Sequence, residues 1–190
     1  MSVTTCYGTY PLSLMDSLRT IKCVVFDVDG SITDGGIYFS SQGDELKKFG
    51  IKDGMGIASI THNTDINVCI VTGRSSQMVK RRANELKITH LYEGVKDKAV
   101  VLGNICKELK ISLNEVLAFG DDINDMPMMA MAGLSACPAD AHPAVLNHVN
   151  IISDFDGGHG AARQICDLLL MSKGVLDFDG FTFLNRLVTR

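Results

Sequence analysis

The chain has 190 residues, which is enough for one domain with a hydrophobic core. Hydrophobic residues make up 46% of it and charged residues 21%, a mixture that argues against a disordered chain. The net charge is −4 and no long basic run occurs, so we expect no nucleic-acid partner.

Short apolar runs rich in β-forming residues recur along the chain and predict buried strands. They lie at 22–27, 66–71, 90–92, 116–119, 134–136 and 149–152. Apolar residues at helical spacing occur between these runs and predict helices at 75–86, 98–109, 125–131 and 161–171. Strands that alternate with helices indicate an α/β protein with a doubly wound, Rossmann-like parallel sheet, whose strands end at one edge.

One segment interrupts this alternation. Residues 36–49 contain two short β-like runs around residues 41–44, which predicts a small β-hairpin insertion. The hairpin follows the first strand directly, so we expect it to overhang the carboxyl edge of the sheet. We expect no large cap domain. Residues 1–20 are interpreted as an N-terminal extension, 21–175 as the single domain and 176–190 as a C-terminal tail.

Two carboxylates, Asp27 and Asp29, follow the first predicted strand and are separated by one residue. Residues two apart in an extended chain project to the same side, at the edge where α/β proteins bind ligands. Neighbouring carboxylates repel each other, and a divalent cation removes that repulsion. Gly30 allows a sharp turn after them. An isolated Asp-x-Asp is more often a solvated turn, so the interpretation depends on the other strand ends.

Polar residues suited to phosphate chemistry follow other predicted strands. The strand at 116–119 is followed by Asp121, Asp122 and Asp125. Together with the first pair, these carboxylates could complete an oxygen cage for Mg²⁺. Thr72 follows the strand at 66–71 and can hold phosphate oxygens, while Lys98 opens a helix and offers a positive charge. Along the chain the acid pair, Thr72, Lys98 and the second acid group occur in that order, each at or beside a predicted strand end, which indicates a Mg²⁺-assisted phosphate site rather than four unrelated turns.

These motifs resemble those of the haloacid dehalogenase superfamily: Asp27-Val-Asp-Gly-Ser-Ile-Thr-Asp34, Thr72, Lys98 and Gly120-Asp-Asp-Ile-Asn-Asp125. Further segments resemble one family within it, the 3-deoxy-D-manno-octulosonate 8-phosphate (KDO 8-phosphate) phosphatases. They are Asp34-Gly-Gly-Ile-Tyr, Glu45-Leu-Lys, Asp53-Gly-Met-Gly-Ile, Ile88-Thr-His-Leu-Tyr, Ala139-Asp-Ala-His-Pro, Gly157-Gly-His-Gly-Ala and Cys166-Asp-Leu-Leu-Leu. The resemblance covers roughly residues 20–178.

The resemblance implies hydrolysis of KDO 8-phosphate to KDO and inorganic phosphate in lipopolysaccharide precursor biosynthesis, by a Mg²⁺-dependent homotetramer. It implies that Asp27 forms an aspartyl-phosphate, that Asp29 is the acid/base, and that Thr72 and Lys98 hold the phosphate. Metal would be held by Asp27, the backbone carbonyl of Asp29 and Asp121, with Asp122 and Asp125 supporting them. Substrate would contact Asp29, Gly50, Ile51, Lys52, Asp53, Gly54, Arg74, Arg82 and Lys98.

Three other interpretations stay open. The first is a phosphatase for another sugar phosphate, such as KDN 9-phosphate, although Arg74 favours KDO 8-phosphate because a cation there can meet the substrate carboxylate. The second is a signalling receiver domain, but receivers lack the hairpin and their phosphorylated Asp ends a middle strand. The third is a catalytically inactive subunit used for assembly, which the complete set of acids disfavours.

Residues outside the motifs bear on compartment and assembly. No apolar run is long enough to cross a membrane and the N-terminus has no signal-peptide pattern, so we expect a cytoplasmic protein with no membrane partner. The six cysteines are widely spaced and are interpreted as reduced thiols. Apolar side chains on the hairpin need a partner surface, which we expect to be the hairpins of neighbouring subunits in a tetramer.

Overall fold

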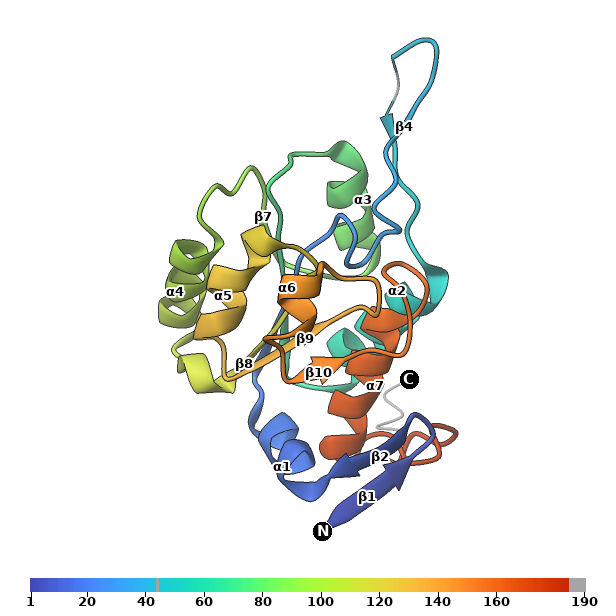
Figure 1. Ribbon diagram of the computed structural model, residues 1–190, viewed down its shortest axis with the longest axis vertical. Coiled ribbons are helices and arrows are strands. Elements are labelled where there is room, and N and C mark those ends of the chain that lie inside the picture. Colours follow the sequence, from blue (N-terminus) through green and yellow to red (C-terminus); the bar gives the residue numbers. More distant parts are fainter. Residues whose placement is uncertain (44, 185–190) are drawn as a thin grey trace.

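A six-stranded parallel sheet forms the centre of the computed structural model, which describes residues 1–43 and 45–184 (Figure 1). The strand order is β10-β9-β8-β3-β6-β7. The strands are β3 (Cys23–Phe26), β6 (Asn67–Val71), β7 (His90–Tyr92), β8 (Val116–Phe119), β9 (Leu134–Cys137) and β10 (Ile151–Ile152). Each strand coincides with one of the predicted runs, and the α/β, doubly wound prediction is confirmed.

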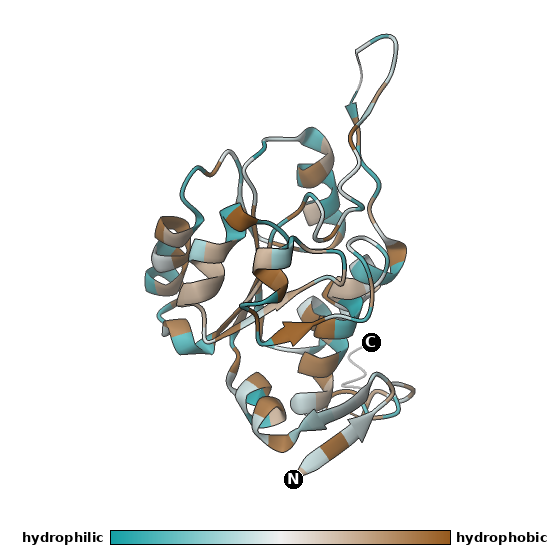
Figure 2. Ribbon diagram, viewed as in Figure 1, coloured by the Kyte–Doolittle hydropathy of each residue, from teal (hydrophilic) through white to brown (hydrophobic). Residues whose placement is uncertain are grey.

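Helices cover both faces of the sheet, because alternate residues of each strand point to opposite faces. In β3, Val24 and Phe26 belong to one buried cluster, and Cys23 and Val25 to the other. The first cluster includes buried residues of α1 (Leu12–Thr20), α2 (Ile51–Asn63), α3 (Gln77–Glu85) and α7 (Ala161–Ser172). The second includes buried residues of α4 (Lys98–Leu109), α5 (Met126–Met131) and α6 (Pro143–Leu146). Hydrophobic residues accordingly lie in the central strands and in stripes along the helices (Figure 2).

Helix α2 was not predicted from the sequence. It contains Gly54 and Gly56, and each interior glycine costs a helix about 1 kcal/mol relative to alanine. The structure shows why a glycine is needed: a Cβ at Gly56 would lie 2.9 Å from Arg163 Cα on α7. Close packing of α2 against α7 therefore compensates for weak intrinsic helix propensity.

The N-terminal segment and the described part of the C-terminal tail lie together at the end of the domain away from the hairpin (Figure 1). Within residues 1–20, β1 (Ser2–Thr5) and β2 (Gly8–Pro11) form an unpredicted antiparallel pair. Helix α1 follows, and its Met15 and Leu18 are buried in the first cluster. In the predicted tail, the Phe178 carbonyl accepts a hydrogen bond of 2.8 Å from the amide of Cys6. Residues 185–190 of that tail lie outside the described residues.

The predicted hairpin is confirmed as β4 (Tyr38–Phe39) and β5 (Glu45–Leu46), which pair antiparallel and project from the body (Figure 1). Residue 44, in its predicted turn, lies outside the described residues. Tyr38, Phe39 and Leu46 are exposed, so the hairpin buries little of its own apolar surface. Across the described part of the chain, no helix is both long enough and apolar enough to cross a bilayer.

Candidate active site

The carboxyl ends of β3 and β8 meet where the crossover connections change face. The helix after β3, α2, lies on one face of the sheet, and the helix after β8, α5, lies on the other. Connections that diverge in this way leave a crevice at the carboxyl edge, which is where open α/β sheets bind ligands. Asp27 directly follows β3, and Asp121 follows β8 after one glycine. The topology therefore brings the two acidic motifs together.

Three carboxylates converge in this crevice. Ligand atoms of Asp27, Asp121 and Asp125 lie within 4.8 Å of one another. The amide of Asp27 donates a hydrogen bond of 2.9 Å to the Phe119 carbonyl, which ties the two strand ends together. The Ser31 hydroxyl donates to Asp121 Oδ1 at 2.8 Å, a contact that was not predicted. Three of the predicted acids thus form one cluster.

Lys98 is the counter-charge of this cluster. It is the first residue of α4, and its Nζ lies 2.5 Å from Asp27 Oδ1 and 2.5 Å from Asp125 Oδ1. The second oxygen of Asp125 accepts hydrogen bonds from the amides of Asp121 and Asp122, at 3.1 and 3.2 Å. Both oxygens of Asp125 are therefore engaged, so this residue holds the lysine and the loop in place.

Asp122 does not join the cluster. It is exposed, and its Oδ1 accepts a hydrogen bond of 2.7 Å from the amide of Ile123, where a short 3₁₀ helix begins (Ile123–Asp125). Its side chain therefore helps to start this turn, a common use of aspartate at a helix N-terminus. Any support it gives to the site passes through the backbone of the loop.

Burial and mutual repulsion raise the pKa values of two carboxylates in this cluster, because the single ammonium group of Lys98 does not balance three negative charges. Burial raises the pKa of Asp27 to about 7, with repulsion from Asp125 adding to the shift and Lys98 opposing it. Burial also raises the pKa of Asp121 to about 6, although the Ser31 hydrogen bond opposes it. The pKa of Lys98 is lowered by burial but raised more by Asp27 and Asp125, so it lies above its usual value.

The donor set fits Mg²⁺. The Oδ1 atoms of Asp27 and Asp121 are engaged by Lys98 and Ser31, which leaves the Oδ2 atom of each carboxylate available to a metal. Mg²⁺ prefers one or two carboxylates completed by waters and substrate phosphate. A divalent cation would also relieve the repulsion that raises the two carboxylate pKa values.

Gly30 brings the loop after β3 close to Asp121. Its φ is +90°, in the region that favours glycine, and this confirms the predicted sharp turn. A Cβ at Gly30 would lie 2.1 Å from Asp121 Oδ2. Gly157 also packs closely against Gly30, since a Cβ at Gly157 would lie 1.8 Å from the Gly30 carbonyl oxygen. The site thus requires two glycines where three chain segments meet.

Asp29 lies apart from the three-carboxylate cluster. Its carboxylate pairs with the ammonium group of Lys47, which follows β5 of the hairpin. The sequence analysis included Lys47 in the segment Glu45-Leu-Lys but gave it no role. A lysine next to exposed hairpin residues looks like a surface charge, and only the fold shows that its side chain is buried.

Thr72 and Arg74 lie at the neighbouring strand end. Phe26 of β3 is opposite Ile70 of β6, so Thr72 lies just beyond the level of Asp27. Thr72 is buried, and its hydroxyl accepts a hydrogen bond of 3.4 Å from the Arg74 amide. The guanidinium of Arg74 lies 3.8 Å from Glu45 of the hairpin. Arg74 therefore stands between the site and the hairpin.

The other predicted substrate residues surround the start of α2. Ile51 and Lys52 are exposed and line a hollow of about 400 Å³ together with Gly50. The Asp53 carboxylate, in contrast, accepts hydrogen bonds from the amides of Gly160 and Arg163, at 3.0 and 3.2 Å. These amides belong to the N-terminus of α7, so Asp53 caps that helix.

Arg82 lies across the same segment from α3. It donates a hydrogen bond of 3.4 Å to the Gly50 carbonyl, and its guanidinium carbon lies 6.0 Å from the centre of the Phe49 ring. A Cβ at Gly54 would lie 1.9 Å from its Nη2, so this glycine makes room for the arginine. Arg82 thus joins α3 to the base of the hairpin and to α2.

Comparison with known proteins gives a consistent result. A family model described as haloacid dehalogenase-like hydrolase matches residues 89–165. The 3-deoxy-D-manno-octulosonate 8-phosphate phosphatase KdsC of Escherichia coli (strain B / BL21-DE3) is 40% identical over 176 residues, 93% of each chain. The crystal structure of the Yersinia pestis enzyme has a TM-score of 0.87 at 41% identity, covering 91% of this chain and 93% of that one. The Moraxella catarrhalis enzyme, in complex with magnesium ion, phosphate ion and KDO, has a TM-score of 0.83 at 34% identity, with coverage of 86% and 94%.

Proposed function

The chain belongs to the family of 3-deoxy-D-manno-octulosonate 8-phosphate phosphatases within the haloacid dehalogenase-like hydrolases, and on this premise we propose that it hydrolyses KDO 8-phosphate to KDO and inorganic phosphate. The observation that carries the proposal is the convergence of Asp27, Asp121 and Lys98 at the carboxyl edge of the sheet. A receiver domain and an inactive assembly subunit find no support in this family membership.

Asp27 is the nucleophile in the proposed reaction. Its carboxylate attacks phosphorus in line with the bond to the sugar oxygen, and an aspartyl-phosphate forms as that bond breaks. Lys98 holds the attacking carboxylate through its 2.5 Å contact with Oδ1 and stabilises negative charge on the phosphoryl group. Thr72, at the next strand end, supplies a hydroxyl for a phosphate oxygen.

Asp29 is the proposed acid and base. In the first step it gives a proton to the departing sugar oxygen, and in the second it takes a proton from the water that hydrolyses the aspartyl-phosphate. Side chains of Asp27 and Asp29 are held by different lysines, Lys98 and Lys47, so the two neighbouring acids have separate environments.

Mg²⁺ is the proposed cofactor. Carboxylate oxygens of Asp27 and Asp121 would hold it, together with the backbone carbonyl of Asp29, while Asp122 and Asp125 support the loop behind them. When bound, the ion would neutralise charge on the phosphoryl group and position it for attack. The close approach of Gly30 and the hydrogen bond from Ser31 would keep Asp121 in position to bind the ion.

The sugar is proposed to lie between the hairpin, the start of α2 and α3. Candidate contacts there are Gly50, Ile51, Lys52, Asp53, Gly54, Arg74 and Arg82. Arg74 is the best candidate for the sugar carboxylate, because its side chain is partly exposed and a guanidinium can bind a carboxylate through two parallel hydrogen bonds. Asp53 would contribute through its backbone, since its carboxylate caps α7.

We also propose that the protein is a cytoplasmic homotetramer. Support comes from the projecting hairpin, whose exposed Tyr38, Phe39 and Leu46 need a partner surface. A closed symmetric arrangement would bury these side chains and cover the open edge of each site.

The decisive experiment is a phosphate-release screen over sugar phosphates, with and without Mg²⁺, using wild-type protein and Asp27→Asn. We expect KDO 8-phosphate to be the preferred substrate, EDTA to abolish activity, and Asp27→Asn to lose turnover while keeping its fold. Preference for KDN 9-phosphate would favour the related phosphatase activity. Substantial turnover by purified Asp27→Asn would rule out the covalent mechanism.

A further inference from the structure

The ion pair of Lys47 and Asp29 has an unusual distribution of exposure. The Lys47 side chain is 0% exposed, whereas the Asp29 side chain remains 26% exposed. Burying an ammonium group removes its hydration, which is unfavourable unless a paired carboxylate offsets the loss. No other interaction of the Asp29 carboxylate is found among the described residues. The lysine side chain is therefore shielded from solvent, while part of the acid that it pairs with stays accessible.

The difference in exposure separates the possible roles of the two residues. A substrate can reach Asp29, but it cannot touch the Lys47 side chain without displacing the surrounding structure. We propose that Lys47 is a positioning residue that acts through Asp29: it holds the carboxyl group in the orientation required for proton transfer to and from the reacting oxygen. This inference rests on the proposed function, because it assumes that Asp29 is the acid and base.

The position of Lys47 couples this orientation to the hairpin. Lys47 lies two residues before Phe49, which bridges antiparallel to Thr33 in the loop after β3. The Thr33 hydroxyl in turn donates to the Val28 carbonyl at 3.1 Å and accepts from the Gly30 amide at 3.3 Å. The base of the hairpin is therefore joined to the Asp29 loop by a backbone bridge and an ion pair. The Asp29 carboxylate therefore keeps this orientation only while the base of the hairpin packs against the loop after β3.

Lys98 cannot replace Lys47 in this role. Its ammonium group is already shared by Asp27 and Asp125. The two acids of the first motif therefore depend on different lysines, one from helix α4 and one from the hairpin. Lys47 engages Asp29 Oδ1, which leaves Oδ2 as the oxygen for the proton. In the first step this proton moves to the sugar oxygen as that oxygen takes the electron pair of the broken P–O bond.

The test compares Lys47→Met with wild type on two substrates. Methionine keeps a long side chain in the buried position but removes the charge and the hydrogen bonds. We expect kcat for KDO 8-phosphate to fall about 10²-fold with KM changed less than about 2-fold, as for a misplacement of about 1 Å. In a single turnover, nitrophenol release from p-nitrophenyl phosphate should fall far less, because this leaving group needs little protonation.

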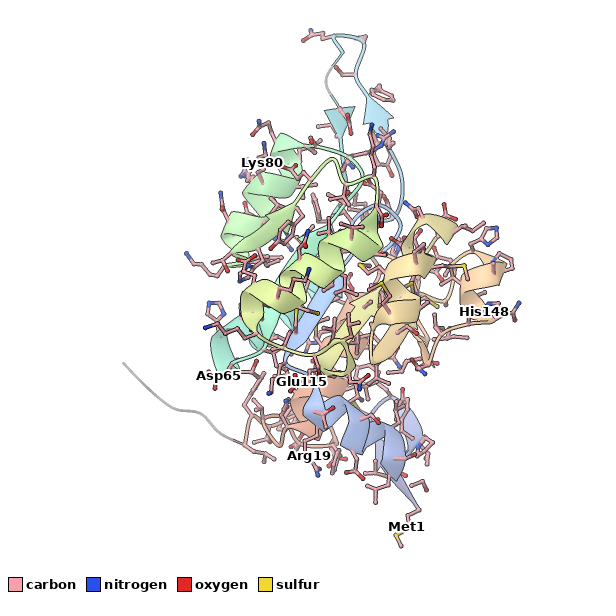
Figure 3. All side chains as sticks on the ribbon, turned by 90° about the vertical axis from the view of Figure 1, so that its left-hand side faces the viewer. Met1, Arg19, Asp65, Lys80, Glu115 and His148 are labelled. Atoms are coloured by element: carbon pink, nitrogen blue, oxygen red, sulfur yellow. The ribbon has the colours of Figure 1, made fainter. Side chains whose placement is uncertain are left out.

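A matched control and a second background separate positioning from a general structural effect. Lys22→Met removes the partner of Glu115, 2.5 Å away, and should leave kcat unchanged. Glu115 lies far from the projecting hairpin (Figure 3). When Lys47→Met is added to Asp29→Asn, kcat should fall by less than about a further 2-fold, because the acid through which Lys47 acts is already lost. If Lys47→Met does not fold, Lys47→Gln replaces it in every comparison.

Three results would overturn the proposal. An increase in KM with kcat retained would mean that Lys47 binds substrate. Equal losses of leaving-group release on both substrates would exclude action through proton transfer. If the loss of kcat in the double variant equals the product of the losses in Lys47→Met and Asp29→Asn, the two residues act independently. If wild type does not turn over KDO 8-phosphate, the proposed substrate is wrong, and the same comparisons are made with the alkyl phosphate that it hydrolyses best.

Discussion

Replacing Gly30 by alanine should damage the site more than the fold. Its φ of +90° lies in the left-handed region, where a residue with a Cβ costs about 1–2 kcal/mol. For a protein of this size, each kcal/mol shifts the melting temperature by about 2–4 °C, so we expect Gly30→Ala to melt about 2–8 °C lower. The protein should therefore remain folded at assay temperature.

The effect on activity has a different origin. The new methyl group would lie 2.1 Å from Asp121 Oδ2, whereas a carbon and an oxygen in contact are separated by about 3.3 Å. The carboxylate must therefore move by about 1 Å, and a misplacement of that size can cost about 10²-fold in rate. Since Asp121 is a proposed metal ligand, the Mg²⁺ concentration for half-maximal activity should rise as well.

The assay measures kcat and Mg²⁺ dependence of phosphate release beside a melting curve. Gly174→Ala is the control, because Gly174 also has a positive φ, +68°, but a Cβ there would meet nothing within 4 Å. It should lose stability to a similar degree and keep its activity. Activity of Gly30→Ala within about 3-fold of wild type at low Mg²⁺, or an equal loss in Gly174→Ala, would refute the reasoning.

Three further predictions concern pH, specificity and assembly. Because the pKa values of Asp27 and Asp121 rise to about 7 and 6 from 3.8, the folded protein retains protons that the unfolded chain releases, so its free energy of unfolding in EDTA should fall between about pH 4 and pH 7. Urea titrations should show this fall, with Mg²⁺ stabilising the protein more at pH 8 than at pH 5; a steady rise with pH in EDTA would contradict it. Arg74→Glu should lower kcat/KM for KDO 8-phosphate far more than for p-nitrophenyl phosphate, because the substrate carboxylate would then meet two acids, the new one and Glu45. Equal losses on both substrates would instead assign Arg74 to the phosphate or the fold. Phe39→Asp should dissociate the tetramer in light scattering and raise KM for the sugar phosphate, whereas a wild-type monomer with full sugar specificity would disprove a shared hairpin interface.

Much of the fold could be predicted because its signals are local. The four inner strands of the sheet are short apolar runs, because a buried parallel strand must be apolar on both faces. The hairpin followed from two β-like runs around a turn. Helix α2 could not be predicted in this way. Gly54 and Gly56 weaken its intrinsic helix propensity, and its stability comes from contact with α7. A local pattern cannot report a contact with a segment more than 100 residues away.

The sequence by itself determined which chemical groups stand at the strand ends. A residue one or two positions after a buried strand must lie at the edge of the sheet, so Asp27, Thr72 and Asp121 could be placed there before the fold was known. Residue type also determined the chemistry available to each of them, since an aspartate can attack phosphorus or bind a metal and a threonine can hold a phosphate oxygen.

Only the tertiary structure decided which groups meet. Asp53 stands in the segment proposed to contact the substrate, and its carboxylate caps α7. Asp125 could have bound a metal, but it holds Lys98 and two amides. Lys47 could have been a surface charge, but its side chain is buried and paired with Asp29. In each case several partners of similar chemistry were available along the chain. The choice among them depended on strand register, crossover direction and the close approach of glycines, which arise only when distant segments pack together.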